Sequence, residues 1–246
     1  MTNRDAAGRG RRTGWVFSVV VYGLAAGVAL VLGYASKPAP AATAIAPGIG
    51  IDVEDSFGRV VEACTLGFLA IGADGAHYAL TAGHCDRGGG VTMSHRTEGN
   101  LRKIGRFAHS VHEGEWGPDI AAIRLHDDEL QRDGWILAER RVRGVTTTLL
   151  PEDTLCFDGR ISGRQCGNFS LTLHAARSRQ AMENLAFFTA TAQPGDSGSP
   201  VYRLERDGSA TAVGIVNGTV SDVGVVATLV EPYLEQWGLT LDTARP

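Results

Sequence analysis

Short apolar runs separated by turn residues dominate the chain after residue 51. Each run has the length of a β-strand; the runs span residues 65–71, 77–81, 120–125, 146–150, 187–191, 212–216 and 223–229. Turn signals such as Asp74-Gly75, Asp207-Gly208 and Asn217-Gly218 separate them. Neither an alternation of strands with helices nor a repeat of fixed period is visible. The pattern predicts an all-β protein, either a sandwich or a barrel.

The C-terminal apolar run has the punctuation of a helix. Pro232 stands near its start and Gly238 just past its end, the positions these residues favour in helices. We therefore predict a short C-terminal helix that packs Tyr233, Leu234 or Trp237 against the β-structure.

The N-terminus combines a basic flank with an uncharged apolar stretch. Residues 1–14 carry four arginines against one acid, and no charged residue occurs between 15 and 34. About 20 apolar residues suffice to span a bilayer, and the positive-inside rule places residues 1–14 in the cytoplasm. Two alternatives stay open for residues 15–34. They are an uncleaved single-pass anchor, or a secretory signal with Ala42-Thr43-Ala44 as its cleavage site.

Prolines among alanines make residues 35–50 a stiff tether. The predicted organisation is a cytoplasmic N-terminus at 1–14, an anchor or signal at 15–34, the tether at 35–50 and a folded domain at 51–246. The folded domain is expected outside the cytoplasmic membrane, either anchored to it or secreted. The net charge of −4 gives no electrostatic support for a nucleic-acid partner.

The chain has four cysteines: Cys64, Cys85, Cys156 and Cys166. None of them has C-x-x-C spacing, which argues against a zinc site built from cysteines. An even number is compatible with two disulfides in an oxidising compartment, in agreement with an external location. Cys156 and Cys166 are close enough in sequence to staple one hairpin, which leaves Cys64 to pair with Cys85.

Three short segments contain the groups needed for nucleophilic catalysis. His84 lies in T-A-G-H-C, Asp119 in P-D-I-A and Ser197 in G-D-S-G. A serine becomes a nucleophile when a neutral imidazole takes its proton and a buried carboxylate fixes the imidazole tautomer. No histidine follows Ser197, so the chain order of α/β-hydrolases is excluded. We predict these three residues as a catalytic triad and the backbone N–H groups of Gly195 and Ser197 as its oxyanion hole.

Each segment has a simpler explanation when it is taken alone. G-D-S-G can be a surface turn, a histidine beside a cysteine can be a packed core residue, and an acid after a proline can be a turn residue. Their joint occurrence in this order favours catalysis. The remaining histidines are interpreted as surface or structural residues: His77, His95, His109, His112, His126 and His174.

Through T-A-G-H-C, G-D-S-G and the spacing of its last two cysteines, the sequence resembles the chymotrypsin/trypsin family of serine endopeptidases. Within that family it is most similar to the compact bacterial branch that includes the streptogrisins and α-lytic protease, over roughly residues 58–242. The resemblance implies two six-stranded antiparallel β-barrels. His84 and Asp119 would come from the first barrel and Ser197 from the second.

The chain departs from this branch beside the nucleophile. The acid before the nucleophile, here Asp196, is usually paired with an arginine at the position of Phe157. Arg160 and Arg164 are the candidates to replace that arginine.

The substrate-binding positions implied by the resemblance also differ from the usual residues. The strand that binds the substrate backbone, usually S-G-G, reads Asn217-Gly218-Thr219. The pocket base, six residues before the nucleophile, is Thr191. Because no acid is present there, we expect a small or apolar residue before the scissile bond.

The predicted function is a serine endopeptidase that acts on protein or peptide substrates through an acyl-enzyme. No cofactor and no metal are expected, and membrane contact is expected only through residues 15–34. The main alternative is a catalytically weak or inactive binding protein of the cell envelope with a peptidase fold, and a third possibility is an esterase on the same fold.

Overall fold

A computed structural model describes residues 44–93, 102–114, 117–126, 131–170, 184–221 and 224–243. The predicted basic N-terminus, the predicted anchor or signal and residues 35–43 of the predicted tether lie outside the described residues. Within the described part of the chain, no helix is long and apolar enough to cross a membrane.

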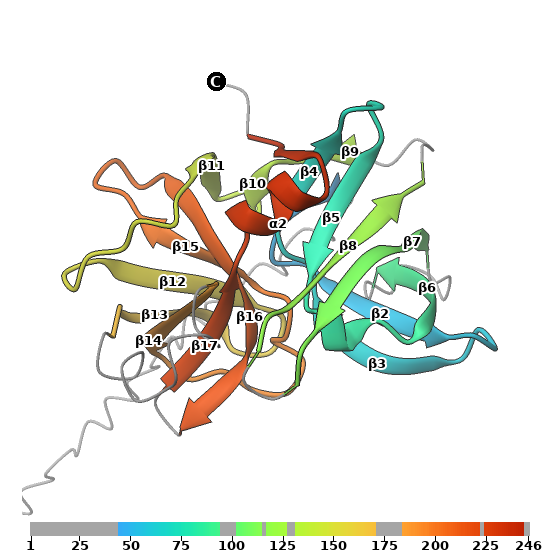
Figure 1. Ribbon diagram of the computed structural model, residues 1–246, viewed down its shortest axis with the longest axis horizontal. Helices are drawn as coiled ribbons and strands as arrows, with labels where there is room; N and C mark the ends of the chain where they lie inside the picture. Colours follow the sequence, from blue (N-terminus) through green and yellow to red (C-terminus); the bar gives the residue numbers. More distant parts are fainter. Residues whose placement is uncertain are drawn as a thin grey trace, which may run out of the picture. The chain divides into compact units, whose positions relative to one another are not determined.

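An antiparallel sheet that curls around an apolar core makes up the first half of the fold (Figure 1). Its eight described strands have the order β18-β4-β5-β8-β7-β6-β2-β3. Their bounds are β2 Gly50–Asp55, β3 Val60–Thr65, β4 Leu69–Gly72, β5 His77–Thr81, β6 Gly88–Met93, β7 Lys103–His112, β8 Asp119–Leu125 and β18 Leu239–Leu241. Residues 66–68 connect β3, at one edge of this sheet, with β4, the second strand from the other edge. The two edges are therefore close together in the fold.

The second half contains the other large sheet among the described residues, in the order β10-β11-β16-β15-β12-β13, with β14 paired to β17 and β17 to β16. The bounds are β10 Trp135–Ile136, β11 Arg140–Val145, β12 Thr154–Gly159, β13 Gly163–Asn168, β14 Leu185–Thr189, β15 Pro200–Leu204, β16 Ala210–Ser221 and β17 Gly224–Leu229. A bridge between Phe169 and Phe188 joins the end of β13 to β14. Six of these strands therefore close into a ring, and β10 and β11 extend the sheet beyond it. The predicted all-β fold with two barrels is confirmed.

The folded unit begins before residue 51. β1 (Ala44–Ile45) pairs in parallel with β9 (Gln131–Arg132), and Ile45 is fully buried. Ile49 is also buried, and its carbonyl accepts a hydrogen bond from the Leu66 N–H at 2.8 Å. Residues 44–50, which the sequence places in the tether, are therefore part of the fold, because their apolar side chains fill its core.

Three local expectations differ from the structure. The run at 65–71 is not one strand, because residues 66–68 separate the end of β3 from the start of β4. β11 ends at Val145 and residues 146–150 form no strand; there the Thr148 N–H bonds to the Thr146 hydroxyl at 3.1 Å. Asn217-Gly218 does not end a strand either. It lies inside β16, at a shift in the register with β17.

Both predicted disulfides are present, Cys64 with Cys85 and Cys156 with Cys166. Cys156 and Cys166 are directly opposite each other on β12 and β13.

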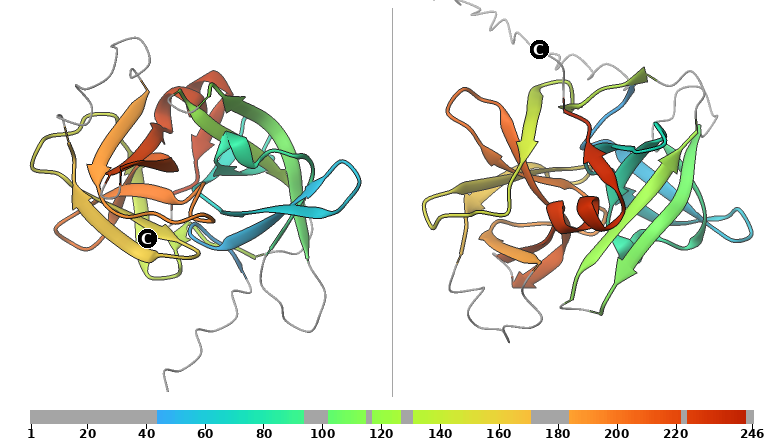
Figure 2. Two further views of the ribbon diagram at one scale, coloured as in Figure 1. Left: turned by 90° about the horizontal axis from the view of Figure 1, so that it is seen from below. Right: turned by 45° about the horizontal axis from the view of Figure 1, so that its top comes forward.

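The predicted C-terminal helix is α2 (Glu231–Gln236), which lies between the two sheets in Figures 1 and 2. Pro232 is in its first turn, and Gly238 follows it with a φ of +63°. Tyr233 is buried, and the ring of Trp237 stacks on the ring of His109 of β7 at 5.2 Å. After the helix, β18 pairs with β4, so the end of the chain returns to the first sheet.

Candidate active site

His84 lies on a short 3₁₀ turn, η1 (Gly83–Cys85), that follows β5. The disulfide of Cys85 ties this turn to β3. A side chain at Gly83 would place its Cβ 2.0 Å from the Val111 carbonyl oxygen of β7. Only glycine therefore lets the turn approach β7 closely, which explains the glycine before the histidine in T-A-G-H-C.

Asp119, the first residue of β8, contacts His84 twice. Its Oδ2 lies 2.6 Å from His84 Nδ1, and its Oδ1 accepts a hydrogen bond from the His84 backbone N–H at 2.7 Å. Asp119 is buried, whereas His84 is partly exposed. An ionised carboxylate in this position holds the proton on Nδ1 and leaves Nε2 as a proton acceptor. The structure thus brings the predicted base and acid into direct contact.

Asn217 and Thr228 of the second sheet hold the backbone of Asp119. The Asp119 N–H donates to the Thr228 hydroxyl at 2.8 Å, and that hydroxyl donates to Asn217 Oδ1 at 2.9 Å. Asn217 Nδ2 donates to the Gly117 carbonyl at 3.3 Å. Asn217, predicted to lie in the strand that binds the substrate backbone, therefore directs its side chain at the segment that carries the acid. Thr228 was not among the residues predicted for the site. The only sign of its role in the sequence is that it carries a hydroxyl in an otherwise apolar strand.

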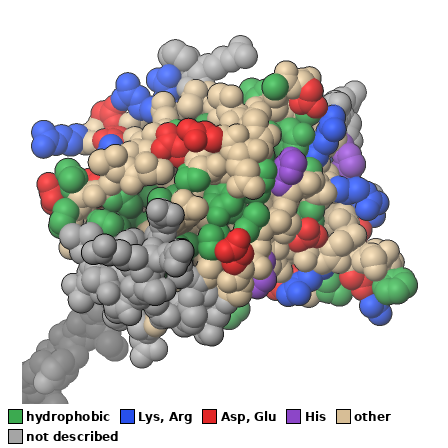
Figure 3. Space-filling model, viewed as in Figure 1, with side chains coloured by type: hydrophobic (Ala, Val, Ile, Leu, Met, Phe, Trp, Pro, Cys, Tyr) green, Lys and Arg blue, Asp and Glu red, His purple; other side chains and the backbone are tan. Residues whose placement is uncertain are grey.

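His112 is a second histidine at Asp119, and the sequence read it as a surface or structural residue. Its Nδ1 lies 3.3 Å from Asp119 Oδ1, and its ring is 6.0 Å from the ring of His84. Histidine side chains reach the surface over the first sheet in Figure 3. His112 could be found only from the strand pairing, because it is directly opposite Asp119 on β7 and β8.

Ser197 lies in a tight turn between two glycines with positive φ, Gly195 at +103° and Gly198 at +89°. The Ser197 carbonyl accepts a hydrogen bond from the Thr65 N–H at 2.8 Å, and the Thr65 hydroxyl donates to the Gly195 carbonyl at 2.9 Å. A Cβ at Gly198 would lie 2.2 Å from the hydroxyl of Thr81, the last residue of β5. The turn therefore packs against the strand that leads to His84.

Among the described residues, the Ser197 hydroxyl makes no hydrogen bond with the His84 ring. Such contacts are often long in unliganded enzymes and shorten when substrate binds.

Asp196 is fully buried, and backbone N–H groups stabilise its carboxylate in place of an arginine. Its Oδ1 accepts from Ile161 at 2.9 Å and Ser162 at 3.1 Å, and its Oδ2 accepts from Gln193 at 2.9 Å. A Cβ at Gly159 would lie 2.3 Å from Asp196 Oδ1, so glycine makes room for the carboxylate.

Arg160 and Arg164, the candidates to replace the missing arginine, bind other acids. Arg160 contacts Asp52 at 3.0 Å, and Arg164 contacts Glu139 at 2.8 Å and Asp158 at 3.2 Å. The hydrogen bond with Glu139 raises the pKa of Arg164 above its usual value. This arginine therefore stays charged beside the buried Asp158.

Three of the predicted substrate-binding positions lie at the surface to different degrees. Thr191 and Thr219 are exposed, and Gly218 is partly exposed. A Cβ at Gly218 would meet no atom within 4 Å, so the strand faces open space at this point.

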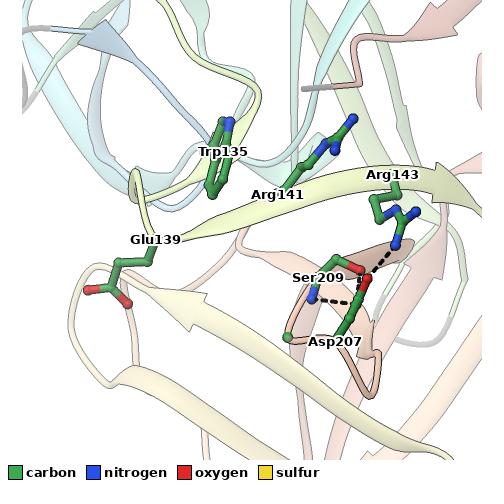
Figure 4. A pocket seen from close by; sticks show the side chains of 7 residues that line it. Trp135, Glu139, Arg141, Arg143, Asp207 and Ser209 are labelled. Carbon is green, nitrogen blue, oxygen red and sulfur yellow. Dashed lines mark hydrogen bonds and ion pairs between the residues drawn. The ribbon is translucent and has the colours of Figure 1, made fainter. Parts of the chain in front are cut away.

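A separate cavity of about 400 Å³ lies beside β10 and β11 (Figure 4). Its lining residues are Trp135, Glu139, Arg141, Arg143, Asp207, Gly208 and Ser209. Arg143 and Ser209 both bind Asp207. The lining contains none of the predicted site residues.

Sequence comparison finds relatives in Mycobacterium tuberculosis. The uncharacterized protein Rv1815 is 33% identical over 166 residues, which cover 63% of this chain and 67% of the relative. The uncharacterized protein MT1863 of another strain is 32% identical over the same length. No family model matches the chain.

Solved structures of bacterial proteases are similar in fold. Nocardiopsis protease superimposes with a TM-score of 0.59 at 23% identity, covering 81% of this chain and 99% of that protein. Thermobifida fusca protease A gives a TM-score of 0.59 at 23% identity and covers 82% of this chain and 100% of that protein. An α-lytic protease homologue, N4, gives 0.58 at 20% identity, with 80% and 98% covered. The chain therefore belongs to the family of the mycobacterial protein Rv1815, and it has the compact bacterial chymotrypsin-like serine peptidase fold.

Proposed function

We propose that the protein is a serine endopeptidase with His84, Asp119 and Ser197 as its catalytic triad. The observation that carries this proposal is the double contact of Asp119 with His84, at 2.6 Å to the ring and 2.7 Å to the backbone N–H. It orients the imidazole and leaves its Nε2 available as a general base. The chymotrypsin-like fold and the chain order of the three residues agree with this assignment.

In the proposed reaction, the Ser197 hydroxyl attacks the substrate carbonyl carbon and its proton passes to His84 Nε2. The oxyanion that forms accepts hydrogen bonds from the backbone N–H groups of Gly195 and Ser197. His84 then gives its proton to the leaving amine, and the acyl group stays on Ser197. A water molecule, deprotonated by the same imidazole, hydrolyses the acyl-enzyme. The positive φ of Gly195 is a conformation that other residues rarely adopt, which supports a specialised turn.

We further propose that substrates carry a small or apolar residue before the scissile bond. Thr191 offers no negative charge to attract lysine or arginine. The substrate backbone would lie along Gly218 and Thr219 of β16, where a Cβ at Gly218 meets no atom within 4 Å.

The proposed site of action is outside the cytoplasmic membrane. The two disulfides require an oxidising compartment. The proposed organisation keeps residues 1–14 in the cytoplasm, an anchor or cleaved signal at 15–34, and the peptidase domain outside. Because residues 44–50 pack in the core, the proposed tether ends at about residue 43.

Covalent labelling with a fluorophosphonate probe tests the proposal. The wild type and Ser56→Ala, which changes an exposed serine, are expected to be labelled. Ser197→Ala is expected to show no labelling, and His84→Ala and Asp119→Asn are expected to be labelled very slowly. A folded wild-type protein that takes up no probe would disprove the peptidase proposal. Turnover of peptides against small esters then separates a peptidase from an esterase.

A binding protein with a peptidase fold is the second candidate. The observations that favour it are two departures from the pattern of the bacterial branch, Phe157 in place of an arginine and Thr219 in place of a glycine. It predicts that Ser197→Ala fully rescues the cell-envelope phenotype of a deletion strain, whereas a peptidase requires Ser197.

A further inference from the structure

We propose that His84, His112 and Asp119 form a binding site for a Zn²⁺ ion, and that the ion inhibits catalysis. Inhibition by the ion rests on the proposed peptidase function, whereas binding of the ion does not.

Three elements bring the donor atoms together. η1 carries His84, the end of β7 carries His112 and the start of β8 carries Asp119, and one donor atom of each lies within 4.8 Å of the others. His112 Nδ1 is 3.3 Å from Asp119 Oδ1, and His84 Nδ1 is 2.6 Å from Asp119 Oδ2. At Zn–ligand distances of about 2.0–2.1 Å, the donor atoms of a tetrahedral site are about 3.3 Å apart. His112 Nδ1 and Asp119 Oδ1 already have this spacing, so Oδ1 is the expected ligand oxygen, and His84 Nδ1 has to exchange its contact with Oδ2 for the ion.

The backbone holds this group in place. His112 and Asp119 are paired residues in the β7–β8 ladder. The Asp119 N–H is bound by Thr228, and Asp119 Oδ1 is bound by the His84 N–H. Most of the ordering that a metal site requires is therefore present before the ion binds.

The donor set suits zinc. Two imidazoles and one carboxylate are a common set of three protein ligands for Zn²⁺, with water in the fourth position. Asp119 is buried, whereas 48% of the His112 side chain is exposed, so an ion can enter from the side of His112. A second cluster, of Cys64, His84 and Cys85, is excluded because both sulfur atoms are in a disulfide.

A zinc ion on His84 Nδ1 would stop general-base catalysis. The metal takes the lone pair of Nδ1, so the proton of the neutral ring moves from Nδ1 to Nε2. A protonated Nε2 cannot accept the serine proton. The ion also withdraws Asp119 from the imidazole that it orients.

Isothermal titration of the full-length Ser197→Ala protein with Zn²⁺ alone tests the binding. We expect one ion bound through this site. His112→Ala and His112→Asn are expected to lose more affinity than the about 10- to 100-fold that a lost outer-shell contact costs. His112→Asn keeps a hydrogen-bond donor at this position but removes the imidazole ligand. A loss of Zn²⁺ affinity in this variant is therefore due to the lost ligand and not to misfolding. The matched control is His126→Ala, which removes an exposed histidine outside the group and is expected to bind as Ser197→Ala alone does.

Fluorophosphonate labelling with and without Zn²⁺ tests the inhibition. At a Zn²⁺ concentration ten times the dissociation constant, the wild-type rate should fall about tenfold and recover with a chelator. The two His112 variants should keep their own metal-free rates. Absence of Zn²⁺ binding, or equal affinity in the His112 variants, would overturn the site. Binding through His112 with an unchanged labelling rate would overturn the inhibition. A wild type that is never labelled would contradict the peptidase function, and the titration would still decide the metal site.

Discussion

The hydroxyl of Thr228 accepts a hydrogen bond from the backbone N–H of Asp119 at 2.8 Å. Thr228 is on β17 of the second sheet and Asp119 is on β8 of the first, so this bond joins the two halves at the proposed catalytic acid. The same hydroxyl donates to Asn217 Oδ1, so it acts as acceptor and donor at once. Asn217 also accepts from the Thr228 N–H at 2.9 Å, which fixes the threonine in this role.

Thr228→Val should weaken both stability and the proposed catalysis. Valine keeps the shape of threonine but leaves the Asp119 N–H without an acceptor, and Asn217 Oδ1 keeps only the backbone N–H of residue 228 as a donor. An unsatisfied buried polar group costs about 1–3 kcal/mol. We expect a loss of that size in chemical denaturation, and slower fluorophosphonate labelling at a temperature where the variant is folded. Thr228→Ser keeps the hydroxyl and should label close to the wild-type rate; an equally slow serine variant would contradict the role of the hydrogen bond.

Asp196→Asn should damage the turn that carries Ser197. The three backbone N–H groups at Asp196 all need an acceptor, and the amide nitrogen of asparagine would face one of them as a donor. We expect a loss of about 1.5–3 kcal/mol in the free energy of unfolding, together with slower labelling.

Gly159→Ala provides an independent test of the same contact. Its new Cβ would lie 2.3 Å from Asp196 Oδ1 and displace the carboxylate without changing any charge. It should slow labelling as Asp196→Asn does. Gly208→Ala is a control for glycine replacement at a distance, because a Cβ there meets no atom within 4 Å. Because Gly208 has a φ of +81°, this control should lose some stability but keep its labelling rate.

The sequence was sufficient to identify the segments that carry the proposed catalytic residues. T-A-G-H-C and G-D-S-G are local motifs, and the two disulfides followed from cysteine spacing. The C-terminal helix followed from Pro232 and Gly238. In each of these cases a short motif or a spacing along the chain defines the feature.

The contacts of Asp119 could not be predicted, because they depend on strand register and on packing between the sheets. His112 reaches Asp119 through cross-strand pairing, and Thr228 reaches it from the other sheet. Asn217 lies in the strand proposed to bind the substrate backbone, and its side chain, at a register shift in β16, bonds to Thr228. The resemblance implied an arginine as the partner of Asp196, whereas the backbone N–H groups of Ile161, Ser162 and Gln193 supply the hydrogen bonds.

Tyr202→Phe should change how stability depends on pH. The Tyr202 hydroxyl donates to the buried carboxylate of Asp158 at 2.6 Å. Burial raises the pKa of Tyr202 above its usual value, and the hydrogen bond to Asp158 raises this pKa further. The folded protein therefore keeps the phenol protonated at a pH where the unfolded chain ionises it, above about 10. The stability from this residue is complete below about pH 10 and is lost as the pH rises further.

The measurement for Tyr202→Phe is urea denaturation at pH 7 and above pH 10. At pH 7 the variant should be less stable by about 1–3 kcal/mol, because Asp158 loses a hydrogen bond. Above about pH 10 the difference should shrink, since only the wild type loses stability by ionisation in the unfolded state. A difference that stays constant with pH would contradict the raised pKa.

The two disulfides should contribute similarly to stability but differently to catalysis. Cys64 and Cys85 are 21 residues apart, and Cys156 and Cys166 are 10 apart. Loop-closure entropy gives each bond about 3 kcal/mol, with a small excess for the longer loop. The first bond holds the turn of His84 directly, because Cys85 is in that turn and Cys64 precedes Thr65, which binds the Ser197 turn. The second bond lies within the β12–β13 ladder, whose backbone pairing also holds the hairpin that contacts Asp196. We therefore expect paired cysteine-to-serine variants to lower the melting temperature by similar amounts. At a temperature where both are folded, the variant without Cys64 and Cys85 should label far more slowly than the other. Equal labelling of the two variants would show that the first disulfide does not position the site.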